Sequence, residues 1–142
     1  MFKLSKKHIS DFYNKNKIKC NIFEFEKNIL NLLLTTDLAI SRCGASTIGE
    51  LIYTGTPFVA IPYPHSMDNH QYLNAKYYSE KKCCWLIEEI DLNDQILFNL
   101  IYGIILDKSK LKNMKNNINK NHRNNAYDEV ENIVKDIFKN EN

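Results

Sequence analysis

Short apolar runs alternate with helical patterns through the middle of the chain. Three of these runs have the length and content of buried strands in a parallel sheet: 37–41 (DLAIS), 58–62 (FVAIP) and 83–87 (CCWLI). A fourth run, 19–25 (KCNIFEF), alternates apolar and polar residues, which also predicts a strand. Because helical segments separate the runs, we expect βα units in an α/β fold, with a Rossmann-like parallel sheet and flanking helices.

Helices are expected around and between these strands, because apolar residues there recur with helical spacing. The four segments with this pattern lie at about 5–16, 28–34, 47–54 and 68–81. The third of them is followed by Gly55 and Pro57, which are typical of a helix end.

The carboxyl-terminal part of the sequence is predicted to be wholly helical. One helix has a single apolar stripe, made of Ile96, Leu97, Leu100, Ile101, Ile104 and Ile105. The Lys/Asn-rich stretch 108–125 predicts a solvated helix with a loop. A last helix places apolar residues on one face, namely Val130, Ile133, Val134, Ile137 and Phe138.

Composition agrees with one ordinary globular domain. The chain has 142 residues, of which 44% are hydrophobic and 25% charged, and this is enough for one domain with one core. We therefore treat 1–142 as a single domain. The formal net charge of +2 does not indicate a nucleic-acid partner, and no apolar run is long enough to span a bilayer.

The cysteines, at positions 20, 43, 83 and 84, are expected to be free thiols. They form no C-x-x-C pair, and the histidines lie at no spacing from them that suits zinc, so no metal site is predicted. With no secretory signal in the sequence, we expect a reducing, cytoplasmic location.

The stretch SRCGASTIGE, 41–50, joins a predicted strand to a predicted helix. Gly44 permits a tight turn there, and the free N–H groups of a helix that starts at Ser46 or Thr47 would favour an anion such as a diphosphate. An alternative is that Thr47 caps the helix and Glu50 closes a capping box. Spacing alone leaves both interpretations open. The stretch is neither a P-loop nor a dinucleotide fingerprint, so nucleotide hydrolysis is not indicated.

A second polar loop and helix start lie at 62–76 (PYPHSMDNHQYLNAK). The four residues Asp68, Asn69, His70 and Gln71 could bind the hydroxyls of a sugar, although His70 taken alone is better explained as a solvated or capping residue. Both loops follow predicted strands, and open parallel sheets bind ligands at the carboxyl ends of their strands. Glu50, one turn into the first helix, would then be within reach of a ribose hydroxyl.

Taken together, the two loops resemble the carboxyl-terminal domain of MurG-type glycosyltransferases, family 28 of the GT-B fold. The family's D-L-V-I-S-R-A-G-A-S-T-I-x-E-L segment is matched here by DLAISRCGASTIGEL. Its G-x-P-x-x-x-I-P-x-P segment is matched by GTPFVAIPYP, and its D-N-H-Q-x-x-N-A segment by DNHQYLNA. The resemblance is dense over 36–76 and looser from about 19 and on to about 107.

The resemblance implies a UDP-N-acetylglucosamine (UDP-GlcNAc) transferase of peptidoglycan and cell-wall synthesis, which moves GlcNAc onto undecaprenyl-diphospho-muramoylpentapeptide. By position, it implies that the backbone at Phe25 and Glu26 meets the uracil and that Glu50 holds the ribose. The diphosphate would be faced by Gly44, Ala45, Ser46 and Thr47, in a loop supported by Arg42. The sugar hydroxyls would be bound by His70 and Gln71. It implies no metal and no cofactor, and it identifies no catalytic base.

The resemblance also implies that the matched family domain is truncated in this sequence. The family's first strand, with its G-G-S-Q-G-A loop, and its amino-terminal acceptor domain lie outside the match. We therefore expect the lipid-linked acceptor to be bound at the membrane surface through that domain or a partner subunit, on the inner face of the cell membrane. Two alternatives are a small catalytic subunit of a two-subunit dolichol-linked GlcNAc transferase and a non-catalytic nucleotide-sugar-binding remnant.

Overall fold

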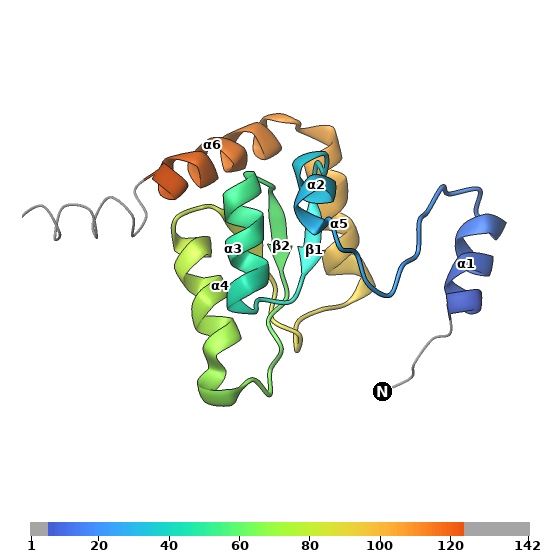
Figure 1. Cartoon of the computed structure of the whole chain (residues 1–142), viewed down its shortest axis with the longest axis horizontal. Coiled ribbons are helices and arrows are strands. Elements are labelled where there is room, and N and C mark those ends of the chain that lie inside the picture. Colours follow the sequence, from blue (N-terminus) through green and yellow to red (C-terminus); the bar gives the residue numbers. More distant parts are fainter. Residues whose placement is uncertain (1–5, 124–142) are drawn as a thin grey trace, which may run out of the picture.

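A parallel sheet with helices on both faces forms the body of the protein in a computed structural model that describes residues 6–123 (Figure 1). Its strands β1 (Ala39–Ser41), β2 (Phe58–Ala60) and β3 (Cys84–Leu86) lie in that order, with β2 in the centre. The predicted Rossmann-like α/β class is confirmed, as are the strands expected at 37–41, 58–62 and 83–87.

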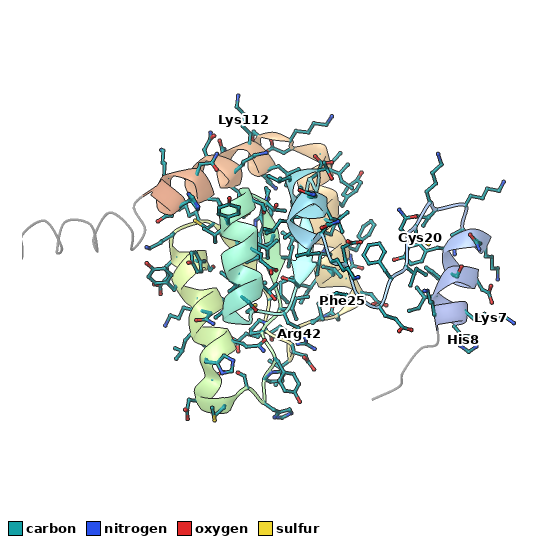
Figure 2. The ribbon with its side chains drawn as sticks, in the orientation of Figure 1. Lys7, His8, Cys20, Phe25, Arg42 and Lys112 are labelled. Atoms are coloured by element: carbon teal, nitrogen blue, oxygen red, sulfur yellow. The ribbon has the colours of Figure 1, made fainter. Side chains whose placement is uncertain are left out.

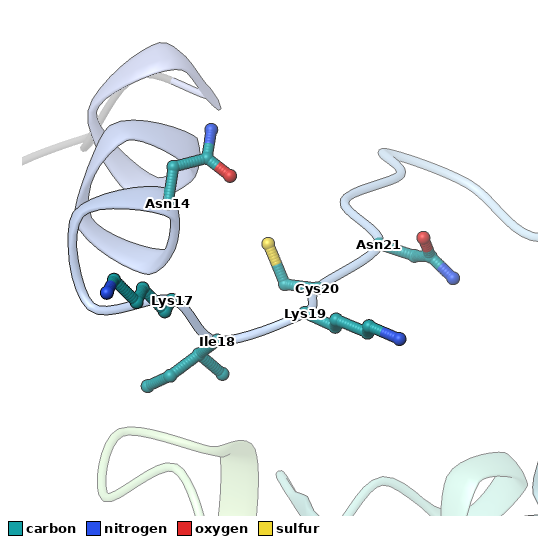
Figure 3. Close-up of a pocket in the computed structure, with 6 residues that line it drawn as sticks. All are labelled: Asn14, Lys17, Ile18, Lys19, Cys20 and Asn21. Atoms are coloured by element: carbon teal, nitrogen blue, oxygen red, sulfur yellow. The ribbon is translucent and has the colours of Figure 1, made fainter.

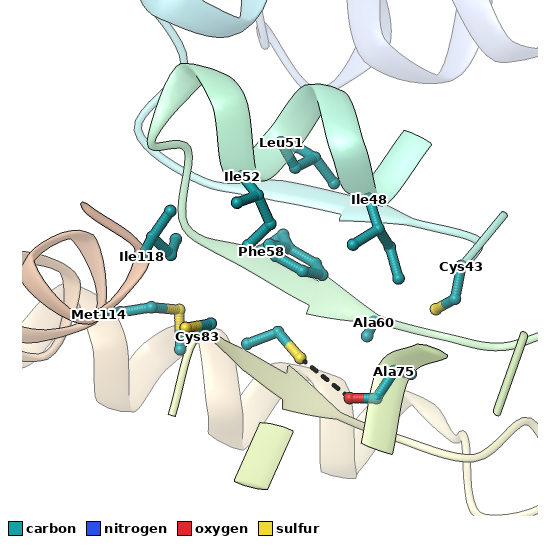
Figure 4. Close-up of a cluster of buried hydrophobic side chains, with 11 residues drawn as sticks. Cys43, Ile48, Leu51, Ile52, Phe58, Ala60, Ala75, Cys83, Met114 and Ile118 are labelled. Carbon is teal, nitrogen blue, oxygen red and sulfur yellow. Dashed lines mark hydrogen bonds between the residues drawn. The ribbon is translucent and has the colours of Figure 1, made fainter. Parts of the chain in front are cut away.

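One face of the sheet is covered by the helices that connect its strands. Helix α3 (Ala45–Thr54) leads from β1 to β2, and a 3₁₀ turn, η1 (Met67–Asn69), followed by α4 (His70–Glu80) leads from β2 to β3. Helix α6 (Ser109–Arg123) also packs on this side (Figure 4). The core that these elements share consists of Cys43, Ile48, Leu51, Ile52, Phe58, Ala60, Ala75, Cys83, Cys84, Met114 and Ile118.

The opposite face is covered by α5 (Asp94–Leu106). Successive strand residues point to opposite faces, so Val59 and Ile61 pack here against Leu97, Leu100 and Ile101. The stripe predicted for this helix was too wide. Ile104 is buried, but Ile96 and Ile105 are 41% and 64% exposed, because only about one side of the helix meets the sheet.

The strand predicted at 19–25 is wrong. This segment runs extended and unpaired between α1 (Lys6–Lys15) and α2 (Ile29–Leu34) (Figure 1). Phe25 in it is 78% exposed. Alternation of apolar and polar residues is a local property, whereas a strand needs a neighbour to complete its hydrogen-bond ladder. No other strand of the described residues pairs with this segment.

The remaining helical predictions agree with the structure in outline. The helix expected at 68–81 is η1 followed by α4, and the stretch expected as helix and loop at 108–125 is one continuous helix, α6, as far as Arg123. The predicted helix at 130–138 lies outside the described residues. Over 6–123, no helix is both long and apolar enough to cross a membrane.

The burial of three thiols gives a direct test of this fold. Cys43, Cys83 and Cys84 are at most 4% exposed, and burial raises the pKa of Cys43 to about 11 and that of Cys84 to about 12. Since the thiolate is the reactive form, we expect a disulfide reagent at pH 8 to label only the exposed Cys20 in the native protein. All four cysteines should react after unfolding in urea. In a Cys20→Ser variant native labelling should disappear, and rapid native labelling of a second thiol would contradict the packing.

Candidate functional site

The candidate site is the edge of the sheet at which all three strands end. Because the strands are parallel, their carboxyl ends lie together, and the loops after β1, β2 and β3 meet there. The first loop leads into α3 and the second leads through η1 into α4. This arrangement brings the predicted residues of segments 42–50 and 70–71 to one edge of the molecule.

The amino terminus of α3 has no side-chain cap. Gly44 is the N-cap residue with extended backbone angles (φ −63°, ψ 149°), and the first bond of the helix runs from the Ile48 N–H to the Gly44 carbonyl (3.0 Å). The N–H groups of Ala45, Ser46 and Thr47 therefore have no acceptor within the helix. Ala45 and Ser46 are exposed, so this end of α3 is open to an anion.

The alternative of a Thr47–Glu50 capping box does not hold in the structure. It requires Thr47 to be the N-cap residue, but the helix begins two residues earlier and Thr47 is already its third residue. The extended angles of Gly44 allow the chain to turn into the helix at that position. Glu50 is released from the capping role, and its carboxylate forms no hydrogen bond or ion pair within the described residues. It lies three and four residues after Thr47 and Ser46, on their side of the helix.

Gln71 bridges the two loops rather than facing outward. Its Oε1 atom accepts hydrogen bonds from the backbone N–H of Cys43 in the first loop (3.1 Å) and of Tyr63 in the second (3.0 Å). Only the Nε2 group of its carboxamide is left for a ligand. No local pattern indicates this role, because the two contacts join residues 28 and 8 positions apart.

His70 stands exposed at the first residue of α4. Its Nδ1 donates to the Met67 carbonyl (2.7 Å), which places the proton on Nδ1 and leaves Nε2 as an acceptor. The two residues before it, Asp68 and Asn69, have φ angles of 50° and 53°. Left-handed backbone is unusual outside glycine, and at this point it turns the chain sharply into α4.

Arg42 connects the ends of all three strands (Figure 2). Its guanidinium donates to the carbonyls of Ile61 (3.4 Å) and Pro62 (3.2 Å) after β2, and pairs with Glu89 after β3. The ring of Tyr63 lies 5.6 Å from its Cζ. Glu89 was not among the predicted site residues, and its only signal in the sequence is the pair of carboxylates, Glu88 and Glu89, directly after a predicted strand.

Phe25 and Glu26 lie on a segment of the chain separate from these loops. Both lie in the extended segment before α2, and the Glu26 carboxylate accepts a hydrogen bond from the Asn28 N–H (2.7 Å). Among the described residues, neither of them forms a hydrogen bond, ion pair or ring contact with the first or second loop. The predicted uracil contact therefore remains a prediction.

Of two hollows on the surface, one lies beside this edge of the sheet and the other does not. One of about 240 Å³ lies beside the second and third loops and is lined by Pro62, Pro64, Asn69, Tyr72, Glu88, Glu89 and Ile90. Another of about 600 Å³ is formed by the turn after α1 and is lined by Asn14, Lys17, Ile18, Lys19, Cys20 and Asn21 (Figure 3). The second is larger, but it contains none of the strand-end residues, so we place the candidate site at the sheet edge.

Comparison with known proteins gives a consistent picture. The glycosyltransferase family 28 C-terminal domain matches residues 3–130. A UDP-N-acetylglucosamine–N-acetylmuramyl-(pentapeptide) pyrophosphoryl-undecaprenol N-acetylglucosamine transferase of Pelagibacter ubique is 40% identical over 107 residues, which cover 72% of this chain and 30% of the relative. The enzyme of the same name from Rickettsia bellii is 36% identical over 130 residues, covering 92% of this chain and 36% of the relative.

A solved structure supports the same fold. The crystal structure of Acinetobacter baumannii MurG superposes with a TM-score of 0.65 at 22% sequence identity, over 72% of this chain and 29% of that one. The chain thus spans about a third of the length of the curated relatives that it matches.

The contacts of Arg42 predict unequal effects of removing it or its partner. Arg42→Ala removes a charged donor from two backbone carbonyls, and we expect it to lower the free energy of unfolding by about 1–2 kcal/mol. Glu89→Gln should change it by less than about 1 kcal/mol, because the ion pair is partly exposed to water. Urea denaturation measures the free energy of unfolding of both variants. Equal losses of stability in the two would show that Arg42 stabilises the fold through the ion pair and not through the carbonyl contacts.

Proposed function

Because the chain belongs to glycosyltransferase family 28, whose C-terminal domain it contains, we propose that it binds UDP-GlcNAc at the strand-end loops. In this proposal it is the donor-binding part of an N-acetylglucosaminyltransferase. The acceptor is undecaprenyl-diphospho-muramoylpentapeptide, and the product is the lipid-linked disaccharide precursor of peptidoglycan. The names of the relatives support this acceptor over a dolichol-linked one.

The observation that carries the proposal is the uncapped amino terminus of α3. Three successive N–H groups, at Ala45, Ser46 and Thr47, lack an intrahelical acceptor, and the helix dipole adds positive potential at the same place. A diphosphate supplies the oxygens that these groups need. During transfer, the same groups would stabilise the negative charge that develops on the departing UDP.

The remaining donor contacts follow from the positions of the side chains. The carboxylate of Glu50 has no partner among residues 6–123 and lies on the Ser46 side of α3, where it is suited to accept hydrogen bonds from the ribose diol. His70 can accept a hydrogen bond from a sugar hydroxyl at its Nε2. Arg42 holds the loops together through the Pro62 carbonyl and does not contact the ligand in this proposal. The backbone at Phe25 and Glu26 belongs to no ladder, so it is free to pair with the uracil.

The proposal assigns acceptor binding to a part of the enzyme outside this domain. Within residues 6–123, strand β1 pairs only with β2, so its other edge has backbone groups that no described strand pairs with, and Ile40 on it is half exposed. We propose that the remainder of the enzyme, in the same polypeptide or as a partner subunit, covers this edge. A lipid-linked acceptor would place the assembly in the cytoplasm, peripherally on the inner face of the cell membrane.

Glu50→Ala tests the ribose contact. Calorimetry should show that the unaltered protein binds UDP, and that the variant binds it more weakly by about 1–3 kcal/mol, the usual cost of losing a hydrogen-bonded charged group. Glu80→Ala, at the opposite end of α4, is the matched control and should bind normally. An unchanged affinity of Glu50→Ala for UDP would show that Glu50 does not bind the ribose.

A transfer assay tests whether the donor and the acceptor are bound by different parts of the enzyme. With UDP-GlcNAc and undecaprenyl-diphospho-muramoylpentapeptide as substrates, we expect no turnover by a protein limited to these 142 residues. Turnover should appear when the acceptor-binding part of a relative is supplied. Turnover by the 142 residues alone would contradict the assignment of the acceptor site to another part.

A further inference from the structure

Two carboxamides on the first turns of α4 hold the two peptide groups on either side of Cys43 in the first loop. The Gln71 Oε1 accepts from the Cys43 N–H (3.1 Å), and the Asn74 Nδ2 donates to the Cys43 carbonyl (3.3 Å). The two side chains lie three residues apart, which puts them on one side of the helix. Both are partly buried, so water competes little for these contacts.

Gly44 does not fix the entry into α3 by itself. Its backbone angles are ordinary, and a side-chain carbon added to it would meet no atom within 4 Å. A glycine in open space has wide conformational freedom. The restraint on the direction of α3 therefore comes from the residue before it, Cys43, whose side chain is buried and whose peptide groups are held by α4.

The same Gln71 oxygen also restrains the second loop. Its second hydrogen bond comes from the Tyr63 N–H (3.0 Å), so one atom fixes the loops after β1 and β2 relative to each other. An amide oxygen has two lone pairs, and both are used here. Direct recognition of a ligand by this side chain is left to its Nε2 group alone.

We propose that Gln71 and Asn74 are positioning residues, which aim the three free N–H groups of α3 at the diphosphate. This inference rests on the proposed function. It differs from the role implied by family resemblance, in which Gln71 serves the sugar. Substitution of a residue that orients the diphosphate site should weaken the binding of UDP and of UDP-GlcNAc equally. Substitution of a residue that binds the sugar should weaken the binding of UDP-GlcNAc alone.

Calorimetry with UDP and with UDP-GlcNAc separates the two roles. Gln71→Met keeps the length of the side chain and removes its oxygen, and Asn74→Ala removes the second contact. We expect each variant to raise the Kd of both ligands by the same factor, roughly tenfold, because hydrogen bonds to a loop peptide are lost. Gln95→Ala is the control and should bind normally, because the Gln95 amide donates to Asn99 on α5 and lies outside the two loops. Circular dichroism verifies that each variant is folded.

Hydrogen exchange of single amides gives a readout that does not depend on the ligand. The Cys43 and Tyr63 amides should exchange slowly in the unaltered protein and in Gln71→Glu, which keeps an acceptor oxygen, and faster in Gln71→Met. Weakened binding of UDP-GlcNAc with unchanged binding of UDP would overturn the inference, and so would unchanged exchange in Gln71→Met. If the unaltered protein binds neither ligand, the proposed function fails, and the exchange rates still decide whether Gln71 holds the two loops.

Discussion

The position of β2 between two parallel neighbours is the constraint on which the rest of the structure depends. Its residues Phe58, Val59 and Ala60 are fully buried, and they alternate between the core under α3, α4 and α6 and the core under α5. The register with β1 and β3 makes all three strands end at one edge. Without this pairing, the three loops would have no common location at which to form a site.

At that edge, the loops are held mainly by side chains that bind backbone groups. Arg42 binds carbonyls after β2, and Gln71 binds amides of the first two loops. Such contacts fix the peptide groups themselves. The Arg42–Glu89 ion pair adds less, since it is partly exposed and screened by water. The arrangement leaves the amino terminus of α3 oriented and uncapped, and this end is the part of the site with the clearest chemistry.

The sequence predicted this architecture where local pattern and tertiary packing agree. The buried strands and the connecting helices have patterns that are typical of a parallel sheet covered on both faces. The prediction failed at 19–25, because a strand depends on a partner that local alternation does not reveal. The start of the next helix was also misplaced, since it was expected at Ser46 or Thr47, whereas Gly44 is the N-cap residue and the helix begins at Ala45. The bridging role of Gln71 depends on contacts between distant residues, and no spacing within the chain indicates them.

The central claim is that the diphosphate of UDP-GlcNAc binds the free amides at the start of α3. The most direct measurement is a titration of ¹⁵N-labelled protein with UDP, followed residue by residue in two-dimensional NMR spectra. The account predicts that the largest shifts occur at Ala45, Ser46 and Thr47 and follow a single binding curve. Saturable binding of UDP that leaves these three amides unshifted, with the changes located elsewhere, would contradict it.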